Sequence, residues 1–345
     1  MFWWDLALTF VRTFLIFFIA LNLVPGLIWM ERRVLAEFQM RVGPNRVGPF
    51  GLLQPIADAV KLMMKEDITP AGVDKPIYYL APVLALLPAV MALAVIPFGP
   101  APWAQISDMP NSLLYSLAIS GLSVYAVAMA GWASNNKYSL LGGLRASAQM
   151  ISYELGMGFA VIVILLGTGS TSLSEIVERQ AQQGWNIIGG GNWFLIPSML
   201  IACLTYFTCG VAETNRAPFD MAEAESELTA GFHTEYSSFK FAMFFLSEYV
   251  NMLIVAALAT TLFLGGWSGP FINGADGYGI GETLLGVAYF LIKVFFFIFV
   301  YIWLRASLPR FRYDQLMNFG WKFLVPLGLA NIFLVAIAIM LNGWK

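Results

Sequence analysis

Eight long apolar runs decide what this chain can fold into. A helix needs about 20 apolar residues to cross the ~30 Å hydrocarbon core of a bilayer. Runs that meet this requirement lie at residues 6–30, 77–97, 112–133, 147–167, 193–212, 239–264, 284–304 and 322–342. We therefore predict an all-α polytopic membrane protein with eight transmembrane helices, folded as a single integral membrane domain over residues 1–345.

The composition supports this class. A chain with 59% hydrophobic and 12% charged residues is typical of integral membrane proteins. Its net charge of −2 gives no reason to expect a nucleic acid as partner. Cys203 and Cys209 lie in one apolar run without the spacing of metal ligands, so we interpret them as small core residues and expect no metal site. The first apolar run is too long for a signal peptide and has no basic leader, which predicts a helix that stays in the membrane.

Lysine and arginine are distributed unevenly between the connections. The first, third, fifth and seventh connections contain most of them, the second and sixth contain none, and the fourth contains only Arg179. By the positive-inside rule, the odd-numbered connections face the cytoplasm and both termini face outward. Among the outward connections, residues 265–282 are rich in Gly and Pro and predict turns. Residues 172–183 predict a short surface helix.

The first connection contains a predicted helix of its own. Residues 41–49 (RVGPNRVGP) cannot be helical throughout, because proline disfavours helix at the residue before it. Residues 51–66 then place apolar and polar side chains on opposite faces, which predicts an amphipathic helix at the cytoplasmic membrane surface. Its pattern fits a lip around an opening as well as it fits a helix that merely lies on lipid.

Acidic residues are concentrated in the fifth connection. The segment ETNRAPFDMAEAESELTAGFHTEY (213–236) holds six carboxylates, Arg216 and the only histidine of the chain, His233. We predict a short helix over about 218–230, with Asp220, Glu223 and Glu227 on one face and Glu225 on the other. Like charges at this spacing repel and favour proton uptake. The alternative is a solvated surface helix without further function.

Three carboxylates also lie within or at the end of predicted membrane helices. By helix geometry Glu154 and Glu248 are roughly 10 Å deep from the cytoplasmic side, and Glu213 ends the fifth span on the same side. Such a row of acids can pass protons when water lies between them, whereas the alternative is three separate structural acids. Lys293, near the middle of the seventh span, is a candidate for the far end of the same path, and Arg12 is interpreted as structural.

Two stretches resemble a known family. ETNRAPFDMAEAESELTAGFHTEY and GPNRVGPFGLLQPIADAVKLMMKE are similar to the signature segments of the H-subunit family of respiratory complex I, the proton-translocating NADH:quinone oxidoreductase. The likeness continues through ERR (31–33), GWASNNKYSLLGGLRASAQMISYE (131–154), FFLSEY (244–249) and LRASLPRFRYDQLM (304–317). It implies an eight-helix subunit of the bacterial inner membrane, at the junction with the peripheral arm, which forms the entrance and wall of the ubiquinone chamber and begins the proton path.

The resemblance also implies roles for particular residues. Those that would line or border the chamber and its loop are Arg32, Arg216, Asp220, Glu223, Glu225 and Glu227. The acidic connection inward would consist of Asp58, Glu154, Glu213 and Glu248. In this family the quinone headgroup ligands come from a neighbouring soluble subunit, so His233 is expected to be a loop or interface residue.

The resemblance implies that ubiquinone is the substrate and that this chain has no redox activity alone. FMN and iron–sulfur clusters are expected in partner subunits, because the chain has neither a dinucleotide fingerprint nor a cysteine cluster. The expected partners are the quinone-site peripheral subunits, the small membrane-arm subunits and membrane lipid. One alternative is the membrane anchor of a complex I-related hydrogenase-type enzyme. Another is a self-contained secondary transporter, for which internal repeats and broken helices around a midplane site would be expected.

Overall fold

The computed structural model describes residues 2–220, 230–270, 272 and 279–342, and these residues form helices and turns without any strand. Within these described residues, eight helical segments are long and apolar enough to cross a membrane, which confirms the predicted fold class. The spans contain helices α1 (Phe2–Phe38), α3 (Lys75–Ala92), α4 (Ser112–Ala133), α5 (Lys137–Thr168), α7 (Ile196–Glu213), α9 (Ser238–Phe263), α10 (Ile280–Ser307), and α11 (Tyr313–Phe319) with α12 (Val325–Asn342). A π-helical turn, Gly320–Leu324, joins the last two.

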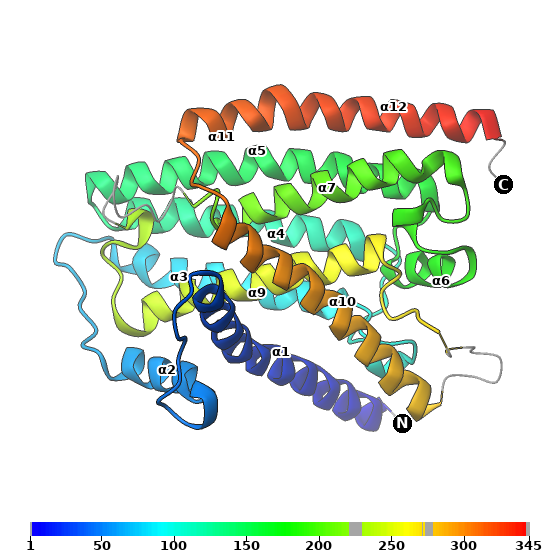
Figure 1. Ribbon diagram of the computed structural model, residues 1–345. Helices are drawn as coiled ribbons and strands as arrows, with labels where there is room; N and C mark the ends of the chain where they lie inside the picture. Colours follow the sequence, from blue (N-terminus) through cyan, green and yellow to red (C-terminus); the bar gives the residue numbers. More distant parts are fainter. Residues whose placement is uncertain (1, 221–229, 271, 273–278, 343–345) are drawn as a thin grey trace.

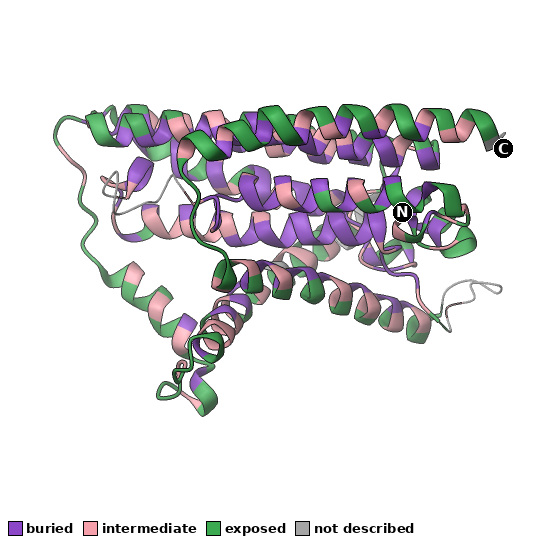
Figure 2. Ribbon diagram, turned by 45° about the horizontal axis from the view of Figure 1, so that its top comes forward, coloured by how far each residue is buried: buried purple, intermediate pink, exposed green. Residues whose placement is uncertain are grey.

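The helices run side by side, and both ends of the chain lie at the same end of the bundle (Figure 1). Helices α3, α4, α5, α7 and α9 form the centre, α12 covers one side, and α1 and α10 cover the other. We call the end that contains the chain termini the terminal end. The opposite end, where the fifth connection lies, is called the acidic end. Figure 2 shows that buried residues are concentrated in the central helices, whereas α2 and α12 have many exposed residues.

Two short helices lie outside the spans, as predicted. Helix α2 (Gln54–Met64) follows a 3₁₀ turn at Pro49–Gly51 and lies at the acidic end, with its apolar Ile56, Val60 and Met63 exposed. Helix α6 (Leu173–Gln183) lies at the terminal end and buries Leu173, Ile176 and Val177. An exposed apolar face on α2 is what a helix at a membrane surface requires.

Small residues allow the central helices to approach closely. A Cβ atom added at Gly131 of α4 would lie 3.1 Å from the Cα atom of Gly143 in α5. Close backbone contact through small residues is how membrane helices gain packing energy, because lipid gives no hydrophobic force between them. At its other end α5 stops at Gly169, which has a φ of 68° and donates its N–H to the carbonyl of Leu165.

Four of the described spans are longer than predicted, namely those of α1, α5, α10 and the last span, which begins at Tyr313. Helix α1 continues to Phe38 instead of ending near residue 30, and α5 begins at Lys137 instead of 147. The extra turns contain polar and charged residues, so an apolar window does not detect them. The consequence concerns Glu154, which lies about 25 Å along α5 from its first residue rather than the 10 Å that we expected.

Candidate functional site

The fifth connection enters the bundle instead of covering it. Asn215, Arg216 and Phe219 are all less than 10% exposed. The side-chain amide of Gln149 in α5 donates to the carbonyl oxygens of Ala212 (2.8 Å) and Phe219 (2.9 Å), which ties both ends of this turn to α5. Buried carbonyl groups need such partners, so the turn is held within the protein. A solvated surface loop, the alternative for this segment, does not describe these residues.

The returning part of the connection is also packed. A 3₁₀ turn at Gly231–His233 buries His233 beside the ring of Phe241. Tyr236 stacks on Tyr78 of α3 with 4.3 Å between ring centroids, and burial raises the pKa of Tyr236. The structure therefore places His233 inside the loop packing. Residues 221–229, which include Glu223, Glu225, Glu227 and most of the predicted loop helix, lie outside the described residues.

Arg216 is the centre of a buried charge cluster that joins four segments. Its Nη1 lies 3.1 Å from Oε1 of Glu31 in α1. The hydroxyl of Tyr249 in α9 donates to Oε2 of Glu31 at 2.6 Å, and Arg305 at the end of α10 also pairs with Glu31. Glu31 is 4% exposed and Arg216 8% exposed. We call Glu31, Arg216, Tyr249 and Arg305 the guanidinium cluster.

The surroundings of Arg216 keep it charged. Burial lowers its pKa, but Glu31, Tyr249 and Glu248 act in the opposite direction, and the net pKa of Arg216 is raised. Its guanidinium carbon lies 4.2 Å from the centre of the Tyr249 ring, and Nη2 is 4.0 Å from Oε2 of Glu248. A buried cation of this kind is tolerated because its charge is paired and hydrogen-bonded.

A polar cavity of about 230 Å³ opens beside this cluster. Three of the carboxylates at the acidic end face it, and so do three arginines; these residues are Glu31, Asp220, Glu248, Arg32, Arg216 and Arg305. A second cavity of about 30 Å³ lies further inward, and it shares Asn215 and Glu248 with the first. Glu213 lines the second cavity together with Asn251, so Glu248 stands between the polar cavity and Glu213.

Glu213 and Glu154 form a second arrangement, which we call the carboxylate pair. Their charges interact, and the Ser120 hydroxyl of α4 lies within hydrogen-bonding reach of Glu213. Oε2 of Glu213 is buried and has no hydrogen-bond partner among the described residues. Glu154 reaches toward α4, where a Cβ atom at Gly121 would lie 2.8 Å from its Oε1. Glu213, the last residue of α7, therefore lies inside the bundle beside the middle of α5.

The remaining predicted site residues divide between the two ends of the bundle. Arg32 pairs with Asp58 at 2.5 Å and links α1 to α2, and Asp220 pairs with Arg310 at 3.1 Å. Lys293 is not near the acids. Its Nζ donates to three backbone carbonyls, of Leu264, Gly266 and Ser268, beyond the end of α9, about 24 Å along that helix from Glu248.

The sequence pattern did not assign a role to three of the four members of the guanidinium cluster. Glu31 and Arg305 lie in the motifs ERR and LRASLPRFR, and Tyr249 ends the motif FFLSEY. From these three motifs, the resemblance gave roles only to Arg32 and Glu248. A charged residue at the end of an apolar run was the available signal, since such a residue is costly to bury without a partner.

The comparisons with known proteins agree with this architecture. A family model described as NADH dehydrogenase matches residues 11–336. The chain is 48% identical to the NADH-quinone oxidoreductase H subunit 2 of Koribacter versatilis (strain Ellin345), over 98% of each chain. It is also 48% identical to the NADH-quinone oxidoreductase H subunits of Ralstonia nicotianae (strain ATCC BAA-1114 / GMI1000) and of Ralstonia pickettii (strain 12J), in both cases over 99% of this chain and 96% of the relative. The chain therefore belongs to the NADH dehydrogenase family of membrane proteins that includes the H subunits of bacterial NADH-quinone oxidoreductases.

Proposed function

We propose that this chain is the membrane subunit of a proton-translocating NADH-quinone oxidoreductase that borders the quinone chamber and begins the proton path into the membrane arm. The observation that carries this proposal is that the two cavities are neighbours and share Glu248 and Asn215 as lining residues. A subunit that only lined the quinone chamber, without coupling quinone reduction to proton translocation, would need only the first cavity. The second one extends the polar surface inward to Glu213.

The guanidinium cluster acts as a fixed positive wall of the chamber. Arg216 cannot lose its proton at physiological pH, and Glu31 holds it in place. A fixed charge next to a cavity stabilises negative charge as it develops there, without any movement of the protein. Reduction of a quinone to a quinol takes up two electrons and two protons, so negative charge and proton demand arise together beside Asp220 and Glu248.

Protons then pass along the acids by way of the second cavity. Its volume of about 30 Å³ is sufficient for one or two water molecules. Water between Glu248 and Glu213 completes a hydrogen-bonded connection, and the interaction of Glu213 with Glu154 carries it to α5. In this proposal Asp58 orients Arg32 at the mouth of the chamber, Glu223, Glu225 and Glu227 complete its loop, and Lys293 belongs to a later part of the path.

The complex supplies what this chain does not. Ubiquinone is the substrate, FMN and iron–sulfur clusters belong to partner subunits, and the chain binds no cofactor itself. The partners are the quinone-site peripheral subunits and small membrane-arm subunits. The acidic end faces the cytoplasm, and both termini face the periplasm. Purified alone, the chain has no redox activity, and NADH oxidation by the isolated chain would contradict this assignment.

The test is the removal of single acids from the assembled complex. We expect Glu213→Gln to lower quinone-linked NADH oxidation at least tenfold, the order of effect of losing one proton-transfer group, while NADH oxidation by an artificial acceptor at the peripheral arm is unchanged. Glu227→Gln should also lower quinone-linked NADH oxidation. Glu178→Gln is the matched control, because Glu178 is exposed on α6 at the terminal end. Normal quinone reduction in both assembled acid variants would refute the proposal.

A further inference from the structure

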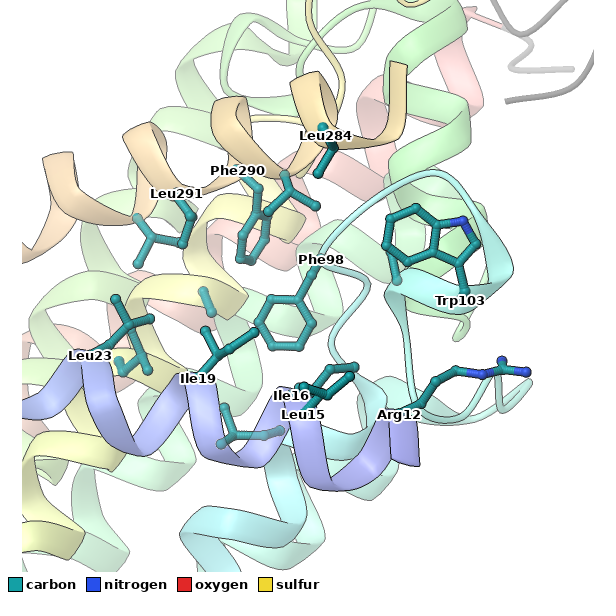
Figure 3. A pocket seen from close by; sticks show the side chains of 16 residues that line it. Arg12, Leu15, Ile16, Ile19, Leu23, Phe98, Trp103, Leu284, Phe290 and Leu291 are labelled. Carbon is teal, nitrogen blue, oxygen red and sulfur yellow. The ribbon is translucent and has the colours of Figure 1, made fainter. Parts of the chain in front are cut away.

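A large apolar cavity lies far from the acids, between α1, α9 and α10 at the terminal end (Figure 3). Its volume is about 340 Å³, and Arg12 is the only charged residue among those that line it. The cavity is open to the side, because Leu15, Ile19 and Leu284 on its walls are at least half exposed. An open apolar cavity on a membrane helix faces the hydrocarbon of the bilayer, so its natural occupant is apolar.

The polar groups of this cavity are gathered at one end. In Figure 3 the Arg12 side chain and the Trp103 indole lie at one end, and Leu23 and Leu291 lie at the other. Arg12 Nη1 donates to the carbonyl of Pro102, the neighbour of Trp103, at 3.4 Å. Tryptophan and arginine are typical of the headgroup level of a membrane. The cavity therefore has a polar head and an apolar body.

The length of the cavity along α1 matches the hydrocarbon thickness of one leaflet of the bilayer. Leu15, Ile16, Ile19 and Leu23 line the α1 side, and the distance along the helix from Arg12 to Leu23 is about 16 Å. Half of the hydrocarbon core of a bilayer is about 15 Å thick. A lipid with its polar end at Arg12 and one acyl chain along α1 would thus fill this cavity, which forms a groove from the headgroup level to the middle of the membrane.

We propose that this groove binds one phospholipid of the outer leaflet, with an acyl chain along α1 and its phosphate on Arg12. The guanidinium is the side chain best suited to a phosphate, which accepts two parallel N–H bonds from it. A quinone tail has no anionic group for Arg12. A helix of a partner subunit would fill the apolar body but would not require the arginine. The site is independent of the proposed quinone function, since it lies at the opposite end of the bundle.

Photoreactive lipids test this directly in the assembled complex, purified in a mild detergent. One probe is a phosphatidylglycerol with a diazirine in one acyl chain, and the second is a diacylglycerol with the same chain and no phosphate. We expect the phosphatidylglycerol to label α1 and α10 lining residues about tenfold more than the diacylglycerol, and Arg12→Gln to remove this difference. Arg12→Lys should keep most of it, because the charge is retained. Arg179→Gln, on the same end but outside the groove, should leave labelling unchanged.

A second variant blocks the groove without touching its charge. Leu284→Trp places a large side chain on an exposed position of the wall and should lower labelling by both probes. Three results would overturn the proposal: equal labelling by the two probes in the wild type, unchanged labelling in both Arg12→Gln and Leu284→Trp, or no labelled lining residue. The last result is expected when a helix from a partner protein occupies the groove.

Discussion

Two carboxylates at the acidic end, Glu31 and Glu213, have opposite surroundings. Glu31 faces two guanidinium groups and a tyrosine hydroxyl, whereas Glu213 faces a second carboxylate, Glu154, and a serine. The first arrangement fixes a charge, because losing it would leave two cations without their partner. In the second arrangement, neither Glu213 nor Glu154 has a cation as partner among the described contacts. Two neighbouring carboxylates without a cation exchange a proton readily.

The difference separates a structural role from a role in proton transport within one site. Glu248 lies between the two arrangements, 4.0 Å from Arg216 on one side and lining the cavity of Glu213 on the other. Variants of the guanidinium cluster should therefore affect folding and quinone binding. Variants of the carboxylate pair should affect proton movement in a complex that still assembles.

The largest effect is expected for Arg216→Met. Removing Arg216 leaves the buried Glu31 with Arg305 as its one remaining cation among the described residues, and removing one partner of a buried ion pair costs about 3–5 kcal/mol. Since Arg216 joins α1, α9 and the fifth connection, we expect little assembled complex on a native gel and no quinone reductase activity. Arg216→Lys, which keeps the charge, should restore assembly in part. Full assembly of Arg216→Met would show that the cluster is not structural.

A smaller effect is expected for Tyr249→Phe. The variant removes the 2.6 Å hydrogen bond to Glu31 and keeps the aromatic ring beneath Arg216. Loss of a hydrogen bond to a charged group costs about 1.5–3 kcal/mol. The complex should assemble with a lower thermal stability and a raised KM for quinone. Tyr125→Phe is the matched control, because Tyr125 is exposed on α4. Equal melting temperatures for Tyr249→Phe and Tyr125→Phe would show that the hydrogen bond from Tyr249 to Glu31 does not stabilise the protein.

The smallest effect of a substitution is expected for Asp58→Asn. Asp58 and Arg32 form a pair whose side chains are 26% and 43% exposed, and pairs of this kind contribute about 0–1 kcal/mol. Assembly and melting temperature should be unchanged. If Arg32 borders the quinone, the KM for quinone should rise while the maximal rate is kept. Less assembled complex in the Asp58→Asn variant would show that this ion pair has a structural role, like the guanidinium cluster.

The guanidinium cluster should contribute no pH dependence. A group whose pKa is raised on folding stabilises the protein below its unfolded pKa and loses that effect as pH rises through its folded pKa. The unfolded pKa of an arginine is already far above physiological pH and the folded pKa of Arg216 is higher still, so this contribution is complete throughout physiological pH. The difference in melting temperature between wild type and Tyr249→Phe should be constant from about pH 6 to about pH 9. A difference that changes with pH would contradict a permanently charged Arg216.

Much of the fold could be predicted because lipid imposes a simple rule on length and hydrophobicity. All eight spans, α2 and α6 follow from it. The start of α5 could not, since residues 137–146 mix lysine, arginine and glycine with leucine. That error also made the distance of Glu154 from the start of α5 too short. Depth in a membrane depends on where a helix begins relative to its neighbours, and the sequence pattern does not contain that information.

The site could be predicted only in its separate parts. The acids were found because charge is rare in this chain, but their pairing depends on contacts between distant segments. Glu31 and Arg305 are 274 residues apart, and nothing in either motif indicates the other. The burial of the fifth connection was missed for the same reason. The sequence left a solvated surface helix open as the alternative, whereas Gln149 and the ring of Tyr153 hold the described part of the connection inside.

Proton translocation by the carboxylate pair is the central claim, and one measurement tests it most directly. Wild-type, Glu213→Gln and Glu154→Gln complexes are reconstituted in liposomes, and the rate of NADH-driven proton movement is recorded with a pH-sensitive dye. We predict that both variants assemble, reduce an artificial acceptor at the wild-type rate, and move protons and reduce quinone at least tenfold more slowly. Wild-type proton movement in both assembled variants would contradict the claim.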